Sequence, residues 1–215
     1  MLRETVSQEI NELFNAILEG KAELAKEIIE EALINKLSPS QILNQGMIAS
    51  MAEVGDRFER GEYYVPEMLI AARAMQQALS ILKPHLKQSD LAAVGRVVIG
   101  TVKGDLHDIG KNLVGMLLEG AGFEIRDLGT DVSAEQFVEA VRGDEADILA
   151  MSALLTTTMP NMKSVVEALH NAGLRDRVKV IIGGAPVTES YSQEIGADGY
   201  APDASRAVKL VKTLL

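Results

Sequence analysis

Residues 96–112 read RVVIGTVKGDLHDIGKN, and this stretch sets the fold of the second half of the chain. The β-branched run from Arg96 to Thr101 predicts a buried strand, and a helical pattern resumes after the polar loop that follows it. The same alternation of a short β-branched run and an amphipathic segment continues to the end of the chain. This alternation is typical of a parallel sheet with helices on both of its faces. The strands are expected at residues 96–101, 124–128, 147–151, 178–182 and 199–200, and the helices near residues 110–121, 133–142, 159–172, 188–195 and 203–214.

The first half of the chain has a different pattern. From residue 4 to about residue 87, apolar side chains recur at intervals of three and four, which predicts amphipathic helices. Gly20 and Gly61 interrupt this pattern at places where helices can end. We therefore expect an antiparallel four-helix bundle in a domain over residues 1–88, and an α/β domain over residues 89–215 after a polar linker.

The composition and charge of the chain argue against nucleic acid and membranes as partners. The 215 residues carry 31 acidic and 21 basic side chains, with a formal net charge of −10, whereas a nucleic-acid-binding surface needs clustered lysine and arginine. No apolar run approaches the length of about 20 residues that spans a membrane. Residues 1–20 contain acidic side chains where a signal peptide is basic and then apolar. We therefore expect a cytoplasmic protein that binds neither nucleic acid nor a membrane.

Polar or glycine-rich segments follow three of the predicted strands. Residues 104–112 follow the first strand, residues 152–158 follow the third, and Gly183-Gly184 follows the fourth. Open parallel sheets bind ligands beyond the carboxyl ends of their strands. We therefore expect these three segments to meet at one pocket.

The first of these segments contains a candidate metal ligand. Asp105 precedes His107 by two residues, and a metal-bound imidazole needs such a neighbour, because one ring nitrogen faces the metal while the other donates to a carboxylate. A loop histidine that caps the following helix would give the same short pattern. The chain has no cysteine, so thiolate ligands and cysteine nucleophiles are excluded.

The spacing of the three segments resembles that of the cobalamin-binding proteins with a Rossmann-like or flavodoxin-like domain. Their pattern is D-x-H-x-x-G, followed by S-x-L and then by G-G. In this sequence 41 residues separate Gly110 from Ser152, and 28 residues separate Leu154 from Gly183. All three parts match in order and spacing.

The resemblance extends to the N-terminal half. Residues 51–58, MAEVGDRF, and residues 64–68, YVPEM, resemble the helical cap of methionine synthase and of the corrinoid proteins that serve methanol, methylamine and methoxy-aromatic methyltransferases. The resemblance thus implies an α/β protein in which an N-terminal four-helix bundle cap precedes a flavodoxin-like or Rossmann-like five-stranded parallel sheet. The implied cofactor is cobalamin or a related cobamide.

The resemblance also implies roles for individual residues. It makes His107 the lower axial ligand of the cobalt, Asp105 its hydrogen-bonded partner, and Thr158 the hydroxyl that bonds to that aspartate. Lys103 and Lys111 flank the loop, where they could meet phosphate or amide groups of the cofactor, but we expect both to be solvated at the surface. The other residues implied to bind the cofactor are Gly104, Leu106, Asp108, Ile109, Gly110, Ser152, Leu154, Thr156, Gly183, Gly184 and Ala204 in the α/β domain, and Asn44, Phe58, Val65 and Met68 in the cap.

The implied function is that of a methyl carrier. Cobalt(I) would accept a methyl group from a substrate-specific methyltransferase and pass it to an acceptor methyltransferase of the tetrahydrofolate or coenzyme M type, with a reductive activator as a further partner. The chain is not expected to turn over alone, because it has no further domain for a donor or acceptor. The alternatives are the cobalamin-binding subunit of an adenosylcobalamin mutase, which shares D-x-H-x-x-G but usually lacks the cap, a cobalamin-dependent sensor, and a flavodoxin-like binder of flavin or phosphate.

Overall fold

The computed structural model of the protein describes residues 2–86 and 94–215, and side chains from residue 8 onward. The chain divides into two compact units, Met1–Ala92 and Ala93–Leu215. The boundary expected between residues 88 and 89 lies outside the described residues, as does most of the linker around it. No helix in the described part of the chain is long and apolar enough to cross a membrane.

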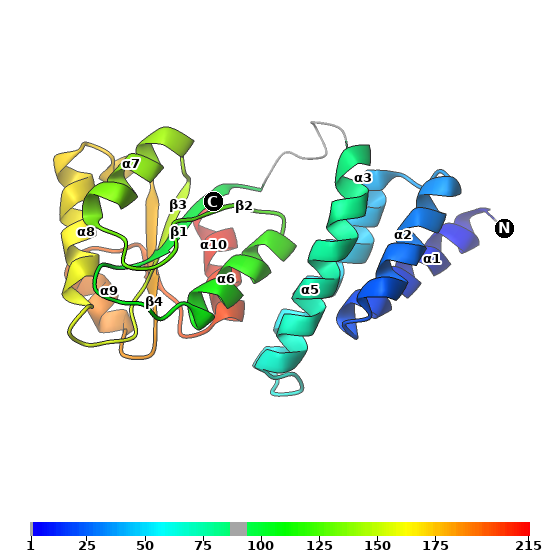
Figure 1. Ribbon diagram of the computed structural model, residues 1–215, viewed down its shortest axis with the longest axis horizontal. Coiled ribbons are helices and arrows are strands. Elements are labelled where there is room, and N and C mark those ends of the chain that lie inside the picture. The colour runs from blue at the N-terminus through cyan, green and yellow to red at the C-terminus, as the bar shows by residue number, and fades with distance from the viewer. Residues whose placement is uncertain (1, 87–93) are drawn as a thin grey trace. The chain divides into compact units, whose positions relative to one another are not determined.

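The described residues of the first unit form helices joined by short turns, without a strand (Figure 1). Its elements are α1 (Leu2–Leu18), α2 (Ala22–Ile34), α3 (Pro39–Gln41), the π-helical segment η1 (Ile42–Ile48), α4 (Ala49–Glu59), α5 (Val65–Leu82) and the 3-10 turn η2 (Lys83–His85). The elements α3, η1 and α4 follow one another without a break, so they form one continuous helical segment. Counted in this way, the described residues of the unit contain the four helices that the sequence predicts. Helix α1 packs against α2 and α4, and α5 packs against α2 and α4.

Two glycines end helices of this unit as expected. Gly20 follows α1 and Gly61 follows α4, and both have a φ of +72°, the left-handed conformation that glycine adopts at little steric cost.

Apolar side chains fill the space between the helices of this unit. Among the largest fully buried side chains are Leu13, Ile17, Ile29, Ile42, Met47, Met68 and Leu82.

The second unit is a parallel sheet between two layers of helices (Figure 1). Its elements are β1 (Arg96–Thr101), α6 (Ile109–Gly120), β2 (Glu124–Asp127), α7 (Ala134–Asp144), β3 (Ile148–Ser152), α8 (Pro160–Asn171), the 3-10 turn η3 (Arg175–Arg177), β4 (Lys179–Gly183), α9 (Glu189–Ile195), β5 (Gly199–Tyr200) and α10 (Ala204–Leu214). All neighbouring strands are parallel and their order is β2-β1-β3-β4-β5. The expected five-stranded parallel sheet is therefore confirmed.

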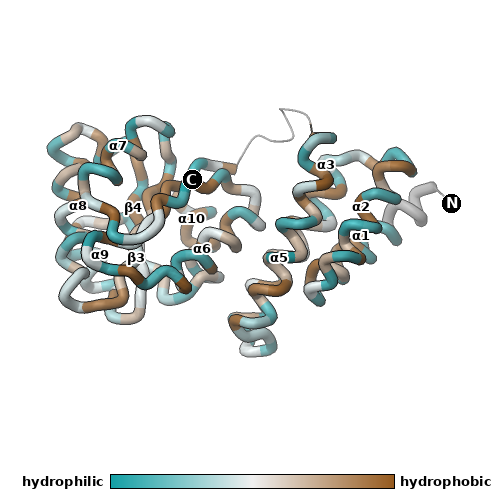
Figure 2. Tube along the Cα trace, viewed as in Figure 1, coloured by the Kyte–Doolittle hydropathy of each residue, from teal (hydrophilic) through white to brown (hydrophobic). Residues whose placement is uncertain are grey.

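Side chains alternate between the two faces of the sheet, so each face has its own core. Val97 and Ile99 pack with Leu118 of α6 on the face that α6 and α10 cover. Val98 packs with Phe137 of α7 on the face that α7, α8 and α9 cover. Apolar and polar residues also alternate along the helices of both units (Figure 2). This alternation lets each helix bury one side and expose the other.

Candidate functional site

The strand order creates a topological switch point at the carboxyl ends of β1 and β3. Strands β2 and β3 lie on opposite sides of β1, so the connections that leave β1 and β3 diverge, and ligands of such sheets bind where they diverge. Thr101 at the end of β1 is in register with Ser152 of β3, and Ser152 is in register with Gly183 of β4. The three segments predicted to meet therefore begin side by side.

The loop from β1 to α6 folds back over the end of its own strand. The Thr101 side chain is fully buried, and its hydroxyl donates to the backbone oxygen of His107 at 3.0 Å. The backbone N–H of Asp105 donates to the oxygen of Val102 at 3.1 Å. These two bonds fix the loop at both ends of the Asp-x-His sequence.

His107 is oriented by the carboxylate of Asp105. The Asp105 side chain is fully buried, and its Oδ1 lies 2.8 Å from Nδ1 of His107 and accepts the backbone N–H of His107 at 3.1 Å. An ionised carboxylate only accepts hydrogen bonds, so Nδ1 carries the proton in the neutral ring. Nε2 then keeps a free lone pair on a side chain that is 52% exposed. This is the form of imidazole that binds a metal.

The second oxygen of Asp105 is bonded to the connection that follows β3. Oδ2 accepts the backbone N–H groups of Leu154 at 2.8 Å and Leu155 at 3.2 Å, and the hydroxyl of Thr158 at 2.7 Å. The predicted contact between Thr158 and Asp105 is therefore present. The Asp105 carboxylate therefore joins the loop after β1 to the loop after β3.

These donors keep Asp105 ionised. Burial by itself would raise the pKa of the Asp105 carboxyl, but the hydrogen bonds from Thr158, His107 and Leu154 together hold that pKa well below its usual range. A carboxyl with so low a pKa stays an acceptor for the Nδ1 proton at neutral pH.

Exposed apolar side chains lie on the two segments that Asp105 joins. Leu106 and Ile109, on either side of His107, are 73% and 77% exposed, and Leu154 and Leu155 are 42% and 41% exposed. Large apolar side chains at these exposures, on two loops that the Asp105 carboxylate joins, provide a surface that an apolar ligand can cover.

The backbone after β4 passes very close to the connection after β3. Gly184 has a φ of +129°, and a Cβ added to it would lie 1.9 Å from the backbone oxygen of Ala153. A Cβ added to Gly183 would lie 3.1 Å from the oxygen of Ala201. The protein's own backbone therefore requires glycine at position 184, independently of any ligand.

The remaining predicted residues of the α/β unit lie around the same strand ends. Gly104 has a φ of +81° directly before Asp105. Asp108 precedes α6 and accepts the side-chain amide of Asn112 at 3.1 Å. Gly110 and Thr156 are exposed, and Ala204 is buried as the first residue of α10.

One expectation about this loop is wrong. Lys103 is exposed as predicted, but Lys111 is only 3% exposed. The ammonium group of Lys111 pairs with Asp127 at the end of β2 and donates to the side-chain oxygen of Asn112 at 2.6 Å. A buried ammonium group needs such partners, and this pairing connects the start of α6 to β2.

The four predicted cap residues lie in the helical unit. Phe58 is half-buried on α4, Val65 is 38% exposed at the start of α5, and Met68 on α5 is fully buried. Asn44 lies in η1, where its side-chain amide donates to the oxygen of Ser40 at 2.8 Å. That these residues face the corrin concerns the relation between the two units and stays a prediction.

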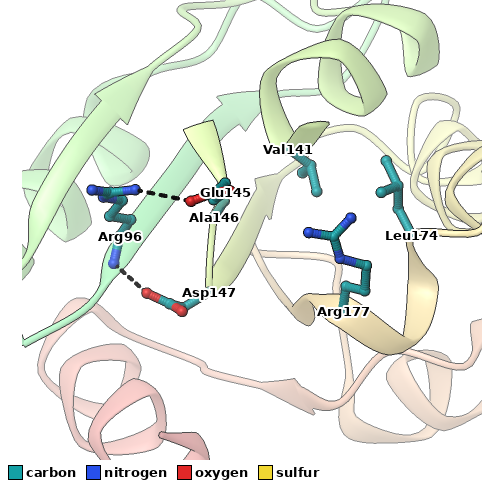
Figure 3. Close-up of a pocket in the computed structure, with 7 residues that line it drawn as sticks. All are labelled: Arg96, Val141, Glu145, Ala146, Asp147, Leu174 and Arg177. Atoms are coloured by element: carbon teal, nitrogen blue, oxygen red, sulfur yellow. Dashed lines mark hydrogen bonds and ion pairs between the residues drawn. The ribbon is translucent and has the colours of Figure 1, made fainter. Parts of the chain in front are cut away.

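A cavity of about 530 Å³ opens at the other end of the sheet, beyond the amino ends of β1, β3 and β4 (Figure 3). Glu145 and Asp147, which line the cavity, are both bonded to Arg96. Arg96 pairs with Glu145 (Nη1 to Oε2, 3.9 Å), and the backbone N–H of Arg96 donates to Asp147 at 2.8 Å. We do not assign this cavity to the cofactor, because His107 lies at the opposite strand ends.

The arrangement at the carboxyl ends fits a metal that arrives in a macrocycle. Among the described residues, no group of three or more histidine and acidic side chains is placed to hold a metal ion. His107 offers one nitrogen with a free lone pair, and exposed apolar side chains lie beside it in the sequence. A single imidazole can complete the coordination of a metal whose other ligands belong to a macrocycle, and the apolar side chains can contact that ring.

Comparisons with known proteins cover both units. Residues 95–209 match the family described as B12 binding domain, and residues 9–83 match a second family of the same description. The chain is 44% identical over 207 residues to the dimethylamine corrinoid protein of Methanosarcina barkeri, which is 96% of this chain and 97% of that one. It is 43% identical over 203 residues to trimethylamine corrinoid protein 1 of Methanosarcina acetivorans, 94% of each chain. Its structure is similar, with a TM-score of 0.87 and 28% identity, to a chain of the methanol:cobalamin methyltransferase complex of Methanosarcina barkeri, over 96% of this chain and 79% of that chain.

The variant Asp105→Asn is expected to destabilise the α/β unit by about 1–3 kcal/mol at pH 7, because an amide cannot accept all the hydrogen bonds that the carboxylate accepts. The pKa of Asp105 is lower in the folded than in the unfolded chain. Its stabilisation is therefore present above the unfolded pKa of about 3.9 and is lost as the pH falls through the folded pKa. Hydrogen exchange of the β1 and β3 amides gives the free energy of unfolding from about pH 7 to pH 3. The difference in this free energy between Asp105→Asn and the parent protein should be constant near pH 7 and should shrink below about pH 4. Asp176→Asn, at an exposed aspartate in η3, serves as the control. A difference in unfolding free energy that does not depend on pH for Asp105→Asn would contradict the conclusion that Asp105 is ionised in the folded chain.

The variant Gly184→Ala is expected to cost about 3 kcal/mol or more, because it adds both a steric collision with Ala153 and an unfavourable φ. Gly173→Ala separates these two causes. Gly173 has a φ of +68° but open space around it, so its cost should be only about 1–2 kcal/mol. Urea titrations followed through the NMR amide signals of β4 give both values. Equal losses in the two variants would show that the close approach to Ala153 is unimportant.

Proposed function

The chain belongs to the B12-binding corrinoid proteins, which carry methyl groups in methyltransferase systems, and we propose that its methyl donor is a methylamine. The relatives named for dimethylamine and trimethylamine are 44% and 43% identical and are matched over nearly their whole length. The chain of the methanol system is 28% identical. The difference in identity favours a methylamine over methanol as the donor.

The observation that carries the site assignment is the bond between His107 and the buried carboxylate of Asp105. It places the proton on Nδ1 and leaves Nε2 free. We therefore assign His107 as the protein ligand of the corrinoid cobalt. When bound, the corrinoid supplies a metal that can accept a methyl group as a nucleophile and later release it.

The residues around His107 control its position and its proton. Whether or not Nε2 is a ligand, Oδ1 of Asp105 lies 2.8 Å from Nδ1 and accepts the hydrogen bond from it. The hydroxyl of Thr158 donates to the other carboxylate oxygen, so Asp105 keeps its charge through both states of the histidine. These contacts would hold the ring of His107 in one orientation, with Nε2 directed away from Asp105, for a corrinoid that His107 would ligate.

A methyltransferase is the partner that this function requires. We further propose that one methyltransferase loads the carrier from the methylamine, that an acceptor methyltransferase of the tetrahydrofolate or coenzyme M type unloads it, and that a reductive activator restores cobalt(I). The protein would then show little turnover without these partners. A cytoplasmic location stays the expectation from the sequence.

The mutase and sensor alternatives are less well supported. The relatives named as methylamine corrinoid proteins match 94% and 96% of this chain, so the helical unit is part of the similarity. The B12-binding family match at residues 9–83 supports the same view. A mutase subunit with D-x-H-x-x-G usually lacks this helical unit.

The proposed donor is tested with separate methyltransferases. The protein, loaded with a cobamide and reduced, should be methylated rapidly by dimethylamine or trimethylamine when the cognate methyltransferase is added, and slowly by either amine alone. Methanol with its own methyltransferase is the matched control and should give much slower methylation. The rate of methylation is measured from the change in the visible absorption spectrum of the corrinoid. Faster methylation from methanol, or rapid methylation without a methyltransferase, would refute the proposal.

The ligand assignment is tested in the cobalt(II) form. Electron paramagnetic resonance of the loaded protein should show coupling to one imidazole nitrogen, and labelling histidine with nitrogen-15 should change the splitting. His107→Ala should abolish this coupling, while His170→Ala, at an exposed histidine of α8, should leave it unchanged. Coupling that survives in His107→Ala would show that another group ligates the cobalt.

A further inference from the structure

Asp131 has an unusual backbone conformation close to the His107 loop. Its φ is +57°, and among the described residues only Lys36 and Glu145 are other non-glycine residues with positive φ. This conformation costs free energy and persists where surrounding contacts hold it. Aspartate tolerates it better than most residues, because its short side chain can form local hydrogen bonds.

The contacts that hold Asp131 all lead to the start of the His107 loop. Its Oδ1 accepts the backbone N–H of Gly104 at 2.7 Å, and its own backbone N–H donates to the oxygen of Asp105 at 3.0 Å. The next residue, Val132, donates its N–H to the oxygen of Thr101 at 3.0 Å. The connection after β2 thus holds the end of β1 and the two residues that follow Lys103.

The same backbone segment is held from the other side by α8. The side-chain amide of Asn161 donates to the oxygen of Lys103 at 2.7 Å. A Cβ added to Gly104 would lie 3.5 Å from Cγ2 of Thr158, an ordinary contact distance, so the φ of +81° rather than crowding favours glycine at this position. The left-handed φ of Gly104 and that of Asp131 occur on two chain segments that are joined by the bond from the Gly104 N–H to Oδ1 of Asp131 and by the bond from the Asp131 N–H to the oxygen of Asp105.

We propose that Asp131 is a positioning residue for the His107 ligand. The carboxylate of Asp105 is fixed by donors from the connection after β3, and Asp131 fixes the backbone of the same residue. With both the side chain and the backbone of Asp105 held, the ring of His107 has its direction set before the cofactor binds. Loss of the Asp131 contacts leaves the carboxylate in place but lets the backbone of residues 104–105 shift. This inference rests on the proposed ligation of cobalt by His107.

Three substitutions separate the two properties of Asp131. Asp131→Asn keeps an oxygen that can accept the N–H of Gly104 and keeps a residue that tolerates positive φ. Asp131→Gly keeps the conformation but removes the acceptor, and Asp131→Ala removes both. The ratio of histidine-ligated to unligated cobalt(II) should stay near that of the parent protein for Asn. It should fall by several-fold for Gly and by about 10- to 100-fold for Ala, which is the range for residues that orient a metal ligand.

The measurement is the nitrogen coupling from His107 in electron paramagnetic resonance spectra of the cobalt(II) protein, with the cobamide content of each sample fixed. A second readout uses the cofactor-free protein, where hydrogen exchange of the Gly104 amide should accelerate in the Gly and Ala variants only. Glu145→Ala is the matched control. Glu145 has a φ of +49° and ends α7 before the amino end of β3, so its loss should affect stability without changing the nitrogen coupling.

The outcomes distinguish this inference from the proposed function. Nitrogen coupling that is full in the parent and Asn proteins and reduced in the Gly and Ala proteins supports the role of Asp131. Unchanged coupling in both Gly and Ala variants, with a faster-exchanging Gly104 amide, overturns it and leaves the ligand assignment standing. If the parent protein itself shows no histidine coupling, the ligand assignment fails and this inference fails with it. If the Ala variant does not fold, the comparison of Gly with Asn decides.

Discussion

The site depends on one buried carboxylate and its need for hydrogen-bond donors. A carboxylate removed from water costs several kcal/mol unless donors replace the water. Asp105 obtains them from two directions, the backbone and ring of His107 on its own loop and the amides of Leu154 and Leu155 on the connection after β3. These segments are 49 positions apart in sequence for the Leu154 contact, and they meet only because β1 and β3 are neighbours in the sheet. The fold therefore creates the site by placing two strand ends together.

Much of this could be predicted because the relevant signals are local. The β-branched runs gave the strands to within a residue or two, and the parallel register then brought Thr101, Ser152 and Gly183 together. The pair Asp105 and His107 was recognisable because a ligating imidazole and its carboxylate partner stand on one loop. The spacing between the motifs further indicated that the segments after the third and fourth strands belong to the same site.

What could not be predicted depends on contacts between distant segments or on backbone atoms. The amide of Leu155 donates to Asp105 whatever its side chain is, so the sequence carries no signal for it. Lys111 looked like a solvated helix residue, but Asp127 at the end of β2 supplies a partner that lets it be buried. The sequence around Asp131 carries no signal of a site, and only its φ and its bond to Gly104 show its connection to His107. In the helical unit, the π-helical segment Ile42–Ile48 was likewise missed, because its apolar spacing is close to that of an α-helix.

The buried carboxylate of Asp105 fixes the tautomer of His107 before any cofactor is present. Long-range proton–nitrogen NMR spectra of the cofactor-free protein, labelled with nitrogen-15 in histidine, measure this directly in the neutral imidazole. The proton is expected on Nδ1, and Nε2 is expected to have the chemical shift of an unprotonated nitrogen. A neutral ring protonated on Nε2 would contradict it, because that nitrogen would then have no lone pair for the cobalt.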